Sequence, residues 1–433
     1  MRGLQFVSFA FAGLLGSSVA LAGSVDWPHF RFDDNHSGFQ PTETTLSTKN
    51  IRTAGLLWKA FLGESDRSLV NYSSPAVVNG VVYIGTTDGR LWAYPADGCG
   101  AEECDTPLWT TPSFGQIMDS PAVANGVVYV GSQTDDNDAS GKLDAFAADG
   151  CGQAVCAPLW QGITGTQSIL QSSPTVSGGF VFIAAFDGKL YAFNADGCGK
   201  NTCKPVWTAQ TGGSIESTPT VSNGMLYIGS NDGKLYAFKA AGCGKKICNP
   251  KWTGDLGDTI FESTPAVAKG LVYINAQHRL AAFGAKGCGA KTCQPVWTAE
   301  ENQDFFSGSP SVANGRVYQP LESGVAVYDA KGCGQSVCAK LWLMFGSGFQ
   351  DGVESSPTIA NGVVYAGRNS GEVIAWNAKP CGQSVCDELW KGRTDDPIVS
   401  SSPTVANGKI YIGSAQGGSG GSIAWLYVYG LAN

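Results

Sequence analysis

The sequence predicts an all-β fold, an eight-bladed β-propeller built of four-stranded antiparallel blades. A Ser/Thr-Pro pair recurs eight times, at intervals of 45 to 53 residues. Short apolar runs joined by Asn-Gly or Asp-Gly turns follow the pairs, and a Trp ends nearly every unit. The prolines of the eight pairs are Pro75, Pro121, Pro174, Pro219, Pro265, Pro310, Pro357 and Pro403.

The composition of the 433-residue chain agrees with a β-rich fold. Gly contributes 58 residues and charged residues only 15%, whereas a helical bundle needs far more charge on its outer faces. Hydrophobic residues make up 43%, which supplies a large core and argues against general disorder. The net charge of −8 argues against nucleic acid as a partner, because phosphate binding needs a basic face.

The first 22 residues have the features of a secretory signal peptide. Arg2 precedes an apolar stretch over residues 6–15, and the Ala-Leu-Ala that ends at Ala22 fits a cleavage site. We expect a lead-in segment over 23–50 and a single propeller domain over 51–433. No later stretch is apolar for 18 residues, so no transmembrane segment is expected. The sequence therefore predicts an exported, soluble protein that is secreted or periplasmic.

Each unit contains four expected strands, A to D in chain order. Strand A follows the Ser/Thr-Pro pair and reaches strand B through a tight turn, as in residues 217–229. A second turn, often Asp-Gly, leads into strand C, as in residues 232–238. Both central residues of a type I′ hairpin need a positive φ, which Asn, Asp and Gly adopt most easily. Strand D begins at the closing Trp, here Trp252.

The two ends of the repeat region predict how the ring closes. Seven closing Trp residues follow the repeats, whereas the eighth, Trp58, precedes the first repeat. The last repeat ends near residues 423–427 without a D strand of its own. We therefore expect residues 56–61 to supply the outer strand of the last blade, because this pairing removes two exposed strand edges.

Fourteen cysteines form seven pairs, each between strands C and D of one unit. We expect seven local disulfides formed in an oxidising compartment, each worth about 2 kcal/mol and mainly restraining a hairpin tip. Zinc binding is disfavoured because each blade offers only two thiolates. The pairs are Cys99/Cys104, Cys151/Cys156, Cys198/Cys203, Cys243/Cys248, Cys288/Cys293, Cys333/Cys338 and Cys381/Cys386.

These repeats resemble the pyrroloquinoline-quinone-repeat family of β-propellers over nearly the whole mature chain. Residues 217–229 and 232–238 are similar to the family repeat, and residues 192–207 resemble its Trp-docking motif with a disulfide hairpin inserted. The resemblance implies the propeller fold. The family's quinoprotein dehydrogenases use an adjacent Cys-Cys pair, a calcium ion and an Asp base. This chain has neither a Cys-Cys pair nor a Cys-x-x-Cys-His haem site, so we expect the non-enzymatic scaffold branch.

The longest interval contains an insertion that resembles a calcium-binding turn. Residues 136–144 match the pattern D-x-[DN]-x-[DNS]-G-x-x-D, in which oxygen ligands alternate before a sharp turn at glycine. The alternative interpretation is a solvated acidic loop, and Ala147 stands where an EF-hand has its bidentate Glu. The expected ligands are Asp136, Asp138, Ser140, the backbone carbonyl of Lys142, and Asp144.

A second exception lies three residues before the repeat prolines, where strand A enters the central channel. Glu216, Glu262 and Glu354 occupy this position, and Asp119 lies one place further on in its own repeat. Together they would form an acidic channel mouth able to take a cation or a basic peptide segment. The alternative is that they are ordinary polar residues in water.

Three other features have a mainly structural interpretation. His278 stands in a turn, and His29 and His36 lie in the lead-in segment, where we expect packing or capping. Aromatic residues at 305–306 and 345–349 could form an apolar surface on the variable face or cover the channel.

The sequence thus predicts a binding or scaffold propeller for protein or cell-envelope partners, with calcium as its one expected cofactor. No catalytic constellation is apparent, and pyrroloquinoline quinone is not expected. The alternatives are a divergent pyrroloquinoline-quinone-dependent dehydrogenase and a polysaccharide-binding propeller.

Overall fold

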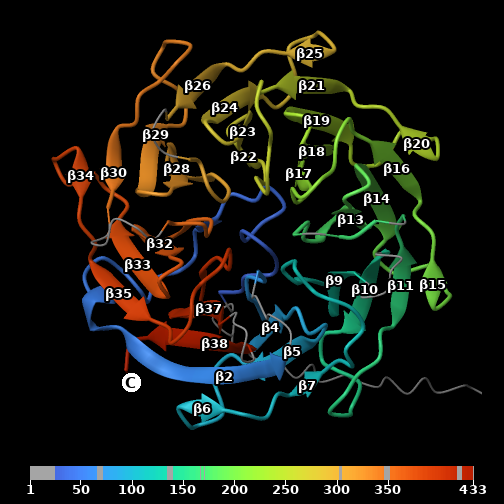
Figure 1. Cartoon of the computed structure of the whole chain (residues 1–433), viewed down its shortest axis with the longest axis vertical. Coiled ribbons are helices and arrows are strands. Elements are labelled where there is room, and N and C mark those ends of the chain that lie inside the picture. The colour runs from blue at the N-terminus through green and yellow to red at the C-terminus, as the bar shows by residue number, and fades with distance from the viewer. Residues whose placement is uncertain are drawn as a thin grey trace, which may run out of the picture.

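Eight blades surround a central axis in the computed structural model (Figure 1). The all-β, eight-bladed prediction is therefore confirmed. The predicted signal peptide lies outside the described part of the chain, and no helix within that part is long and apolar enough to cross a membrane. The structure describes residues 25–65, 72–133, 140–165, 167–169, 171–301, 305–345, 352–416 and 422–432.

The four main strands of each blade run antiparallel from the channel to the rim. The A strands are β3 (Ala76–Val78), β8 (Ala122–Ala124), β12 (Thr175–Ser177), β17 (Thr220–Ser222), β22 (Ala266–Ala268), β27 (Ser311–Ala313), β31 (Thr358–Ala360) and β36 (Thr404–Ala406). The B strands are β4 (Val81–Gly85), β9 (Val127–Gln133), β13 (Phe180–Ala184), β18 (Met225–Ser230), β23 (Leu271–Asn275), β28 (Arg316–Leu321), β32 (Val363–Gly367) and β37 (Lys409–Gln416). The C strands are β5 (Leu91–Pro95), β10 (Gly141–Ala147), β14 (Lys189–Asn194), β19 (Lys234–Lys239), β24 (Arg279–Gly284), β29 (Gly324–Asp329), β33 (Glu372–Asn377) and β38 (Ser422–Gly430). The D strands are β7 (Trp109–Thr110), β11 (Trp160–Ile163), β16 (Trp207–Gln210), β21 (Trp252–Asp255), β26 (Trp297–Glu300), β30 (Trp342–Met344), β35 (Trp390–Arg393) and β2 (Gly55–Ser65).

The N-terminal strand β2 closes the ring as the D strand of the eighth blade. It pairs antiparallel with β38, with Ala60 opposite Leu426 and Trp58 opposite Val428. Figure 1 shows the two strands side by side, blue against red. The prediction that residues 56–61 complete the last blade is therefore confirmed.

A closed belt of eight hydroxyl groups joins the blades around the channel. The Ser or Thr before each repeat proline accepts a hydrogen bond of 2.8–3.2 Å from the backbone N–H of its equivalent in the preceding blade. The recurring Ser/Thr-Pro pair is explained by this contact, because an apolar side chain has no acceptor for a buried N–H. The belt consists of Ser74, Ser120, Ser173, Thr218, Thr264, Ser309, Ser356 and Ser402.

The residue before each belt member ties strand A to strand B of the same blade. In six blades it is a Ser whose hydroxyl accepts from the backbone N–H twelve positions later, as Ser217 does from Gly229. The sixth blade has Gly308 there, and the residue twelve positions later is Pro320. The missing hydroxyl is thus matched by a residue that has no N–H to donate.

The apolar core lies in the seams between neighbouring blades. At six seams the closing Trp on strand D packs on a left-handed glycine in the C–D connection of the next blade. A Cβ on Gly98 would lie 2.8 Å from the Trp58 ring, so this contact needs glycine. A Tyr on strand B also reaches the next blade, and the Tyr129 hydroxyl donates to the carbonyl oxygen of Ala195 at 2.9 Å. The same bond joins five further Tyr–Ala pairs.

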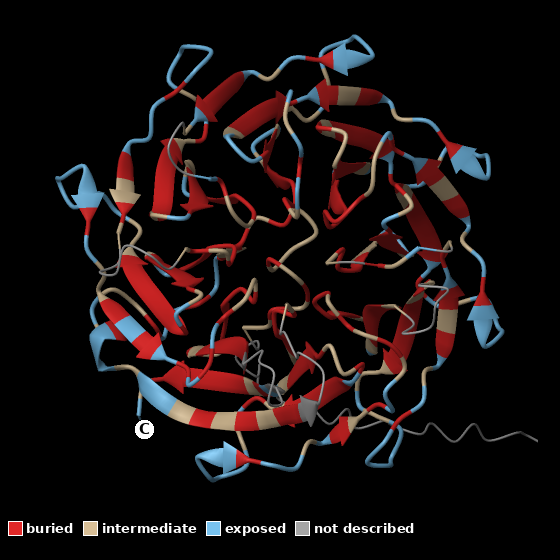
Figure 2. Ribbon diagram, viewed as in Figure 1, coloured by how far each residue is buried: buried red, intermediate tan, exposed pale blue. Residues whose placement is uncertain are grey.

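The seven predicted disulfides are present in the C–D connections. Figure 2 shows these hairpins projecting, exposed, from the outer edge of the ring. Each hairpin also touches the D strand of the preceding blade. Five of them form short parallel strands there: β6 (Glu103–Cys104), β15 (Thr202–Cys203), β20 (Ile247–Cys248), β25 (Thr292–Cys293) and β34 (Val385–Cys386).

The second cysteine of each pair is buried, so each predicted hairpin restraint is anchored at its inner end. Cys156 is 3% exposed and Cys338 is 5% exposed, whereas the first cysteine of every pair faces the solvent. The backbone N–H of Cys156 donates to the carbonyl oxygen of Thr110 at 2.8 Å, and that of Cys338 donates to Thr298 at 2.7 Å. Both acceptors belong to the D strand of the preceding blade. Each disulfide therefore links an exposed tip to a residue packed in the seam.

The disulfide hairpins thus also join neighbouring blades, a contact that the sequence did not predict. Val155 and Val337 make the equivalent parallel contact as single bridges, so all seven hairpins join two blades. The seam between the seventh and eighth blades has no hairpin. There the helix η1 (Ile51–Thr53) and its flanks take its place, and the Trp390 indole donates to the Ala54 carbonyl oxygen at 2.9 Å.

The lead-in segment crosses the channel and contacts the blades in chain order. Six A strands each donate a central N–H to one of its carbonyl oxygens. In the first blade Val77 donates to Trp27, and in the seventh blade Ile359 donates to Gly38. The other four pairs are Val123 to Pro28, Val221 to Asp34, Val267 to Asn35 and Val312 to Ser37. The strand β1 (Phe39–Gln40) then pairs with β31.

Candidate binding site at the mouth of the central channel

The lead-in segment closes the channel from below. Buried Arg31 donates to the carbonyl oxygens of Thr264 and Pro310 and to the Ser311 hydroxyl, and burial lowers the pKa of Arg31 to about 9. Buried His36 bonds the Phe30 carbonyl oxygen at 2.7 Å, and burial lowers its pKa to about 3. These contacts make His36 a packed, neutral residue, as expected. The open space above the segment is therefore a cup with a floor, not a tunnel.

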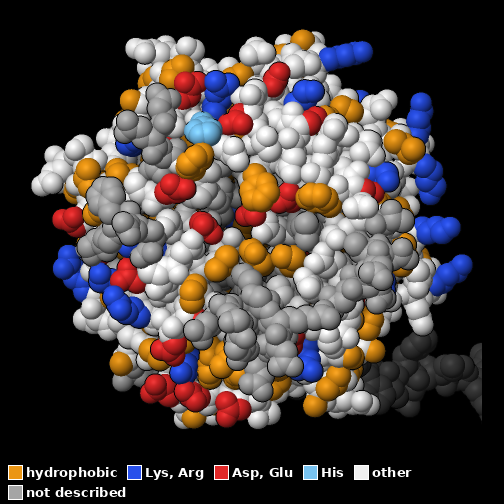
Figure 3. All heavy atoms as spheres, in the orientation of Figure 1, with side chains coloured by type: hydrophobic (Ala, Val, Ile, Leu, Met, Phe, Trp, Pro, Cys, Tyr) orange, Lys and Arg blue, Asp and Glu red, His pale blue; other side chains and the backbone are white. Residues whose placement is uncertain are grey.

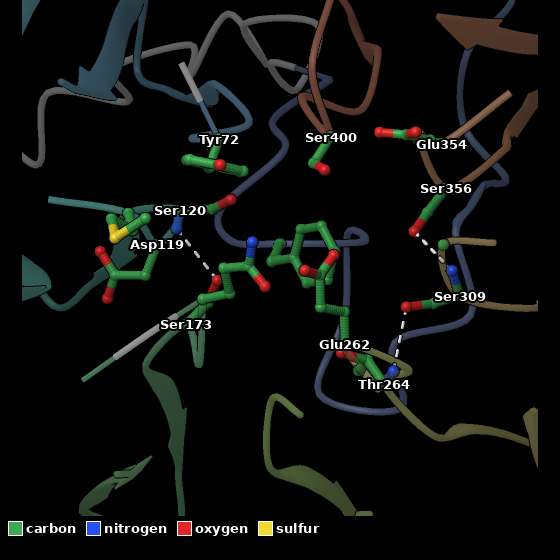
Figure 4. A pocket seen from close by; sticks show the side chains of 14 residues that line it. Tyr72, Asp119, Ser120, Ser173, Glu262, Thr264, Ser309, Glu354, Ser356 and Ser400 are labelled. Atoms are coloured by element: carbon green, nitrogen blue, oxygen red, sulfur yellow. Dashed lines mark hydrogen bonds between the residues drawn. The ribbon is translucent and has the colours of Figure 1, made fainter. Parts of the chain in front are cut away.

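Six of the eight residues that stand three places before the repeat prolines line this cup, which we call the mouth (Figure 4). Among the predicted acidic residues, Asp119, Glu262 and Glu354 line it. Figure 3 shows acidic and hydrophobic side chains gathered around the centre of this face. The lining residues are Phe30, Tyr72, Met118, Asp119, Ser120, Gln171, Ser173, Glu262, Thr264, Gly308, Ser309, Glu354, Ser356 and Ser400.

Glu262 has a strongly raised pKa within the mouth. Burial raises its pKa to about 7, a hydrogen bond with Gln171 works against this shift, and the charges of Glu216 and Glu354 add to it. Figure 4 shows its carboxylate reaching into the centre of the cup. A cationic ligand beside this carboxyl group would favour its charged form and lower its pKa.

Glu354 and Glu216 are held by matching amides. The side-chain amide of Asn369 donates to Glu354, and that of Asn231 donates to Glu216, both at 2.8 Å. Glu216 lies beside the cup and not in its lining, yet its charge is close enough to raise the pKa of Glu262. The structure thus brings the three predicted Glu residues into one electrostatic group.

Asp119 has a different place from the three Glu residues. It occupies the position of the strand-tying Ser in its blade, and its Oδ2 accepts the N–H of Gly131 at 2.5 Å. Its carboxylate points away from Glu262 in Figure 4. Burial raises the pKa of Asp119 well above its usual value, and the charge of Asp144 adds to the shift. We therefore assign Asp119 to the blade structure.

Aromatic side chains extend the mouth toward the fifth blade. Phe261 is 52% exposed and Phe305 46%, and both line a hollow that shares Tyr72, Glu262 and Glu354 with the cup. His278 packs on Phe305, with ring centres 4.8 Å apart, and pairs with Asp258 at 3.2 Å. Phe306 is buried and contributes to the core instead. Positions 346–349 of the second predicted aromatic group lie outside the described residues.

Two lining residues were not recognised in the sequence. Phe30 forms part of the floor, but the lead-in segment has no repeat against which its place could be judged. Phe261 precedes Glu262 directly, and an apolar residue beside a mouth Glu is the signal that could have revealed it.

The predicted calcium loop is described only in part. Asp136 and Asp138 lie outside the described residues, so calcium binding stays a prediction. Ser140 precedes β10, and Lys142 and Asp144 lie on it. Asp144 is fully buried, and its two oxygens accept from the Ser132 hydroxyl and the Gln161 amide, both at 2.6 Å. Within the described ranges, no group of three His, Cys, Asp or Glu residues could hold a metal ion.

The mouth does not fit pyrroloquinoline quinone, the cofactor that this kind of fold suggests. That quinone is a tricarboxylate, and the described lining contains carboxylates but neither Lys nor Arg. We therefore derive no quinone chemistry at this site.

The fold, the Ser/Thr-Pro belt and the Trp contacts together define a propeller of the pyrroloquinoline-quinone-repeat class. A sequence profile described as "Outer membrane protein assembly factor BamB" matches residues 153–377, just over half of the chain. The chain belongs to this family. No curated protein sequence matches it significantly.

Solved structures that resemble the chain share its fold at low sequence identity. BamB from Moraxella catarrhalis has a TM-score of 0.58 and 16% identity, over 84% of this chain and 99% of that one. The quinohemoprotein alcohol dehydrogenase from Comamonas testosteroni has a TM-score of 0.68 and 14% identity, over 94% of this chain and 80% of that one. The computationally designed protein Ika8 has a TM-score of 0.61 and 13% identity, over 86% of this chain and 99% of that one. An enzyme, an assembly factor and a design thus share this architecture, so the fold alone does not select a function.

Proposed function

We propose that this protein is an exported scaffold whose mouth binds a protein partner through a basic segment that also carries apolar side chains. The observation that carries the proposal is the placement of Glu262 and Glu354 beside exposed Phe261 and Phe305, in a described lining without Lys or Arg. Carboxylates attract Lys or Arg, and aromatic rings provide apolar area and faces for cations. The assembly factor named by the matching family is consistent with a partner-binding role.

Export is part of the proposal and has separate support. All fourteen cysteines are paired in disulfides, which form and persist in oxidising compartments such as the bacterial periplasm. The N-terminal sequence has the pattern of a signal peptide. Mass spectrometry of the protein recovered from its native compartment would test this part, with a mature N-terminus near Gly23 as the expected result.

Calorimetric titration with two synthetic peptides tests the binding site. One peptide alternates Lys and Phe, and the other has Glu in place of Lys. We expect the Lys peptide to bind and the Glu peptide not to bind. The double variant Glu262→Gln/Glu354→Gln should weaken Lys-peptide binding by about thirtyfold, since the two lost charge pairs contribute about 1 kcal/mol each.

A matched control distinguishes the loss of charge at the mouth from the loss of charge elsewhere on the protein. Asp105→Asn/Asp149→Asn removes two exposed carboxylates on the outer edge, and it should leave peptide binding unchanged. Equal weakening in both double variants would contradict the mouth as the binding site. Binding of a neutral glycan with no dependence on Glu262 or Glu354 would favour the polysaccharide-binding alternative instead.

A further inference from the structure

Charge is distributed unevenly around the outer edge of the ring. The C–D connections of the third to sixth blades carry nine Lys residues and one Asp, Asp196, although the whole chain has a net charge of −8. The C–D connections of the other blades are mainly acidic, with Asp97, Glu102, Glu103, Asp105, Asp149, Asp387 and Glu388 against Lys379. The nine Lys residues, here called the basic arc, are Lys200, Lys204, Lys245, Lys246, Lys251, Lys286, Lys291, Lys331 and Lys340.

The lysines of the basic arc face the solvent. All nine lysines are exposed. Among the described residues, only Lys340 of the nine forms an ion pair, and its partner is Glu301. Figure 3 shows Lys and Arg side chains projecting from the edge that carries β15, β20 and β25 in Figure 1. The arc is therefore available to an anionic partner and is not neutralised by the protein itself.

The hairpins hold the arc in a fixed position on the edge. The backbone carbonyl oxygens of Lys246 and Lys291 each accept an N–H from the D strand of the preceding blade, from Thr208 and Thr253, at 2.8 Å. A disulfide closes each of these hairpins directly after this contact. The charged groups are thus carried by ordered backbone, so little backbone entropy is lost when they bind.

Apolar side chains stand among the lysines of the arc. Ile247, which follows Lys245 and Lys246 directly, is 67% exposed, and Val296 is 55% exposed. Val206 is 37% exposed, and its carbonyl oxygen accepts from the Lys246 ammonium group. A surface that presents lysines together with protruding aliphatic side chains matches a membrane interface, where headgroups take the charge and the acyl boundary takes the apolar groups.

We propose that the basic arc docks the propeller edge-on to an anionic phospholipid surface. The lysines of the fourth and fifth blades contact the phosphate headgroups, and Ile247 and Val296 enter the boundary below them. A soluble polyanion would use the lysines but would give no role to the protruding aliphatic side chains. The arc lies on the rim while the mouth lies at the axis, so this docking does not depend on the peptide-binding proposal.

Flotation with unilamellar vesicles tests the docking. We expect the protein to bind phosphatidylcholine vesicles that contain about one third phosphatidylglycerol, and not pure phosphatidylcholine vesicles. Binding should fall steeply between about 0.1 M and 1 M salt, because the screening length shrinks from about 10 Å to 3 Å. The variant Lys245→Glu/Lys246→Glu/Lys291→Glu should bind at least about a hundredfold more weakly.

A charge-matched control uses lysines outside the arc. Lys49→Glu/Lys269→Glu/Lys379→Glu changes three exposed residues by the same total charge and should retain vesicle binding. Equal loss in both triple variants, or equal binding to neutral vesicles, would overturn the proposal. Both variants should keep the Lys-peptide affinity of the mouth, so failure of one proposal is distinguishable from failure of the other.

Ile247→Thr tests the apolar contribution separately. The third and fifth blades have Thr202 and Thr292 at this position, so the fold accepts the change. We expect weaker vesicle binding and unchanged binding to soluble polyphosphate. If the variant loses nothing on vesicles and polyphosphate displaces the wild type completely, the ligand is a soluble polyanion and the membrane proposal is wrong.

Discussion

At the scale of single residues, backbone strain marks the mouth. Gln171, Glu262 and Ser400 have φ angles of 57°, 56° and 59°, in the left-handed region that residues other than glycine seldom adopt. All three stand three places before a repeat proline and line the cup. Strained positions persist where the surrounding structure fixes them, and they concentrate at binding sites. The sequence pattern identified this position, but it could not show which side chains turn into the cup.

Glu262→Gln should change how stability depends on pH. The pKa of Glu262 is about 7 in the folded protein, above its value in the unfolded chain. Its contribution to stability is therefore full at low pH and is lost as the pH rises through about 7. The variant should show a smaller fall in melting temperature between pH 5 and pH 8, measured by calorimetry. Glu300→Gln, on the exposed end of β26, is the control, and equal slopes in both variants would contradict the assignment.

Asp144→Ala should destabilise the second blade whether or not calcium binds. The change leaves the Ser132 hydroxyl and the Gln161 amide without their carboxylate, at a cost of about 1–3 kcal/mol in the free energy of unfolding. Asp138→Ala removes only a predicted ligand, so it should abolish any rise in melting temperature on adding calcium. A calcium-dependent rise that survives Asp138→Ala would contradict the predicted loop.

At the scale of elements, the disulfides of the hairpins were predictable from the sequence, whereas the contacts of the hairpins with the preceding blade were not. Their disulfides follow from the spacing of the cysteines, because a regular C–D insertion brings both thiols to one turn. Their contact with the preceding blade was not predictable, since a parallel pairing of two residues, such as Cys203 with Gly162, leaves no periodic pattern. For the same reason the spacing could not show that Cys156 and Cys338 are buried in a seam. The seven hairpins therefore join neighbouring blades at seven of the eight seams.

A pair of Tyr variants can measure one seam contact. Tyr129→Phe removes the bond to the Ala195 carbonyl oxygen and should lower the free energy of unfolding by about 1 kcal/mol. Tyr365 occupies the same position in the seventh blade, and its buried hydroxyl has no hydrogen-bond partner among the described residues. Tyr365→Phe should therefore be neutral or stabilising. Chemical denaturation of both variants makes the comparison, and equal losses would contradict this interpretation of the seam.

At the scale of the whole molecule, the number of blades and the closure by β2 were predictable, whereas the path of the lead-in segment was not. Eight Ser/Thr-Pro pairs and a Trp before the first repeat define a ring that must borrow its last strand. The lead-in segment has no repeat, and its bonds to six blades use backbone atoms. Backbone contacts impose little sequence pattern, so no motif predicted them.

Deleting residues 25–40 should weaken the whole ring. The six A-strand N–H groups lose their partners, at about 1 kcal/mol for each bond. We expect a melting temperature lower by many degrees and a broader transition. Hydrogen exchange on the intact protein provides a second test, which does not require the shortened chain to fold. Slow exchange at Val77, Val221 and Ile359 is expected, and fast exchange there would contradict the role of the segment.

The pairing of β2 with β38 also dictates the order of assembly. β2 ends at Ser65, and β38 ends at Gly430, so the first long strand to be synthesised waits for the last. At about 5–20 residues per second the delay is about 20–70 s, during which the edge of β2 that pairs with β38 has no native partner. A chain that ends early never supplies that partner. Its unpaired strand then remains exposed, which distinguishes an incomplete chain from a finished one for any chaperone or protease that recognises open strand edges.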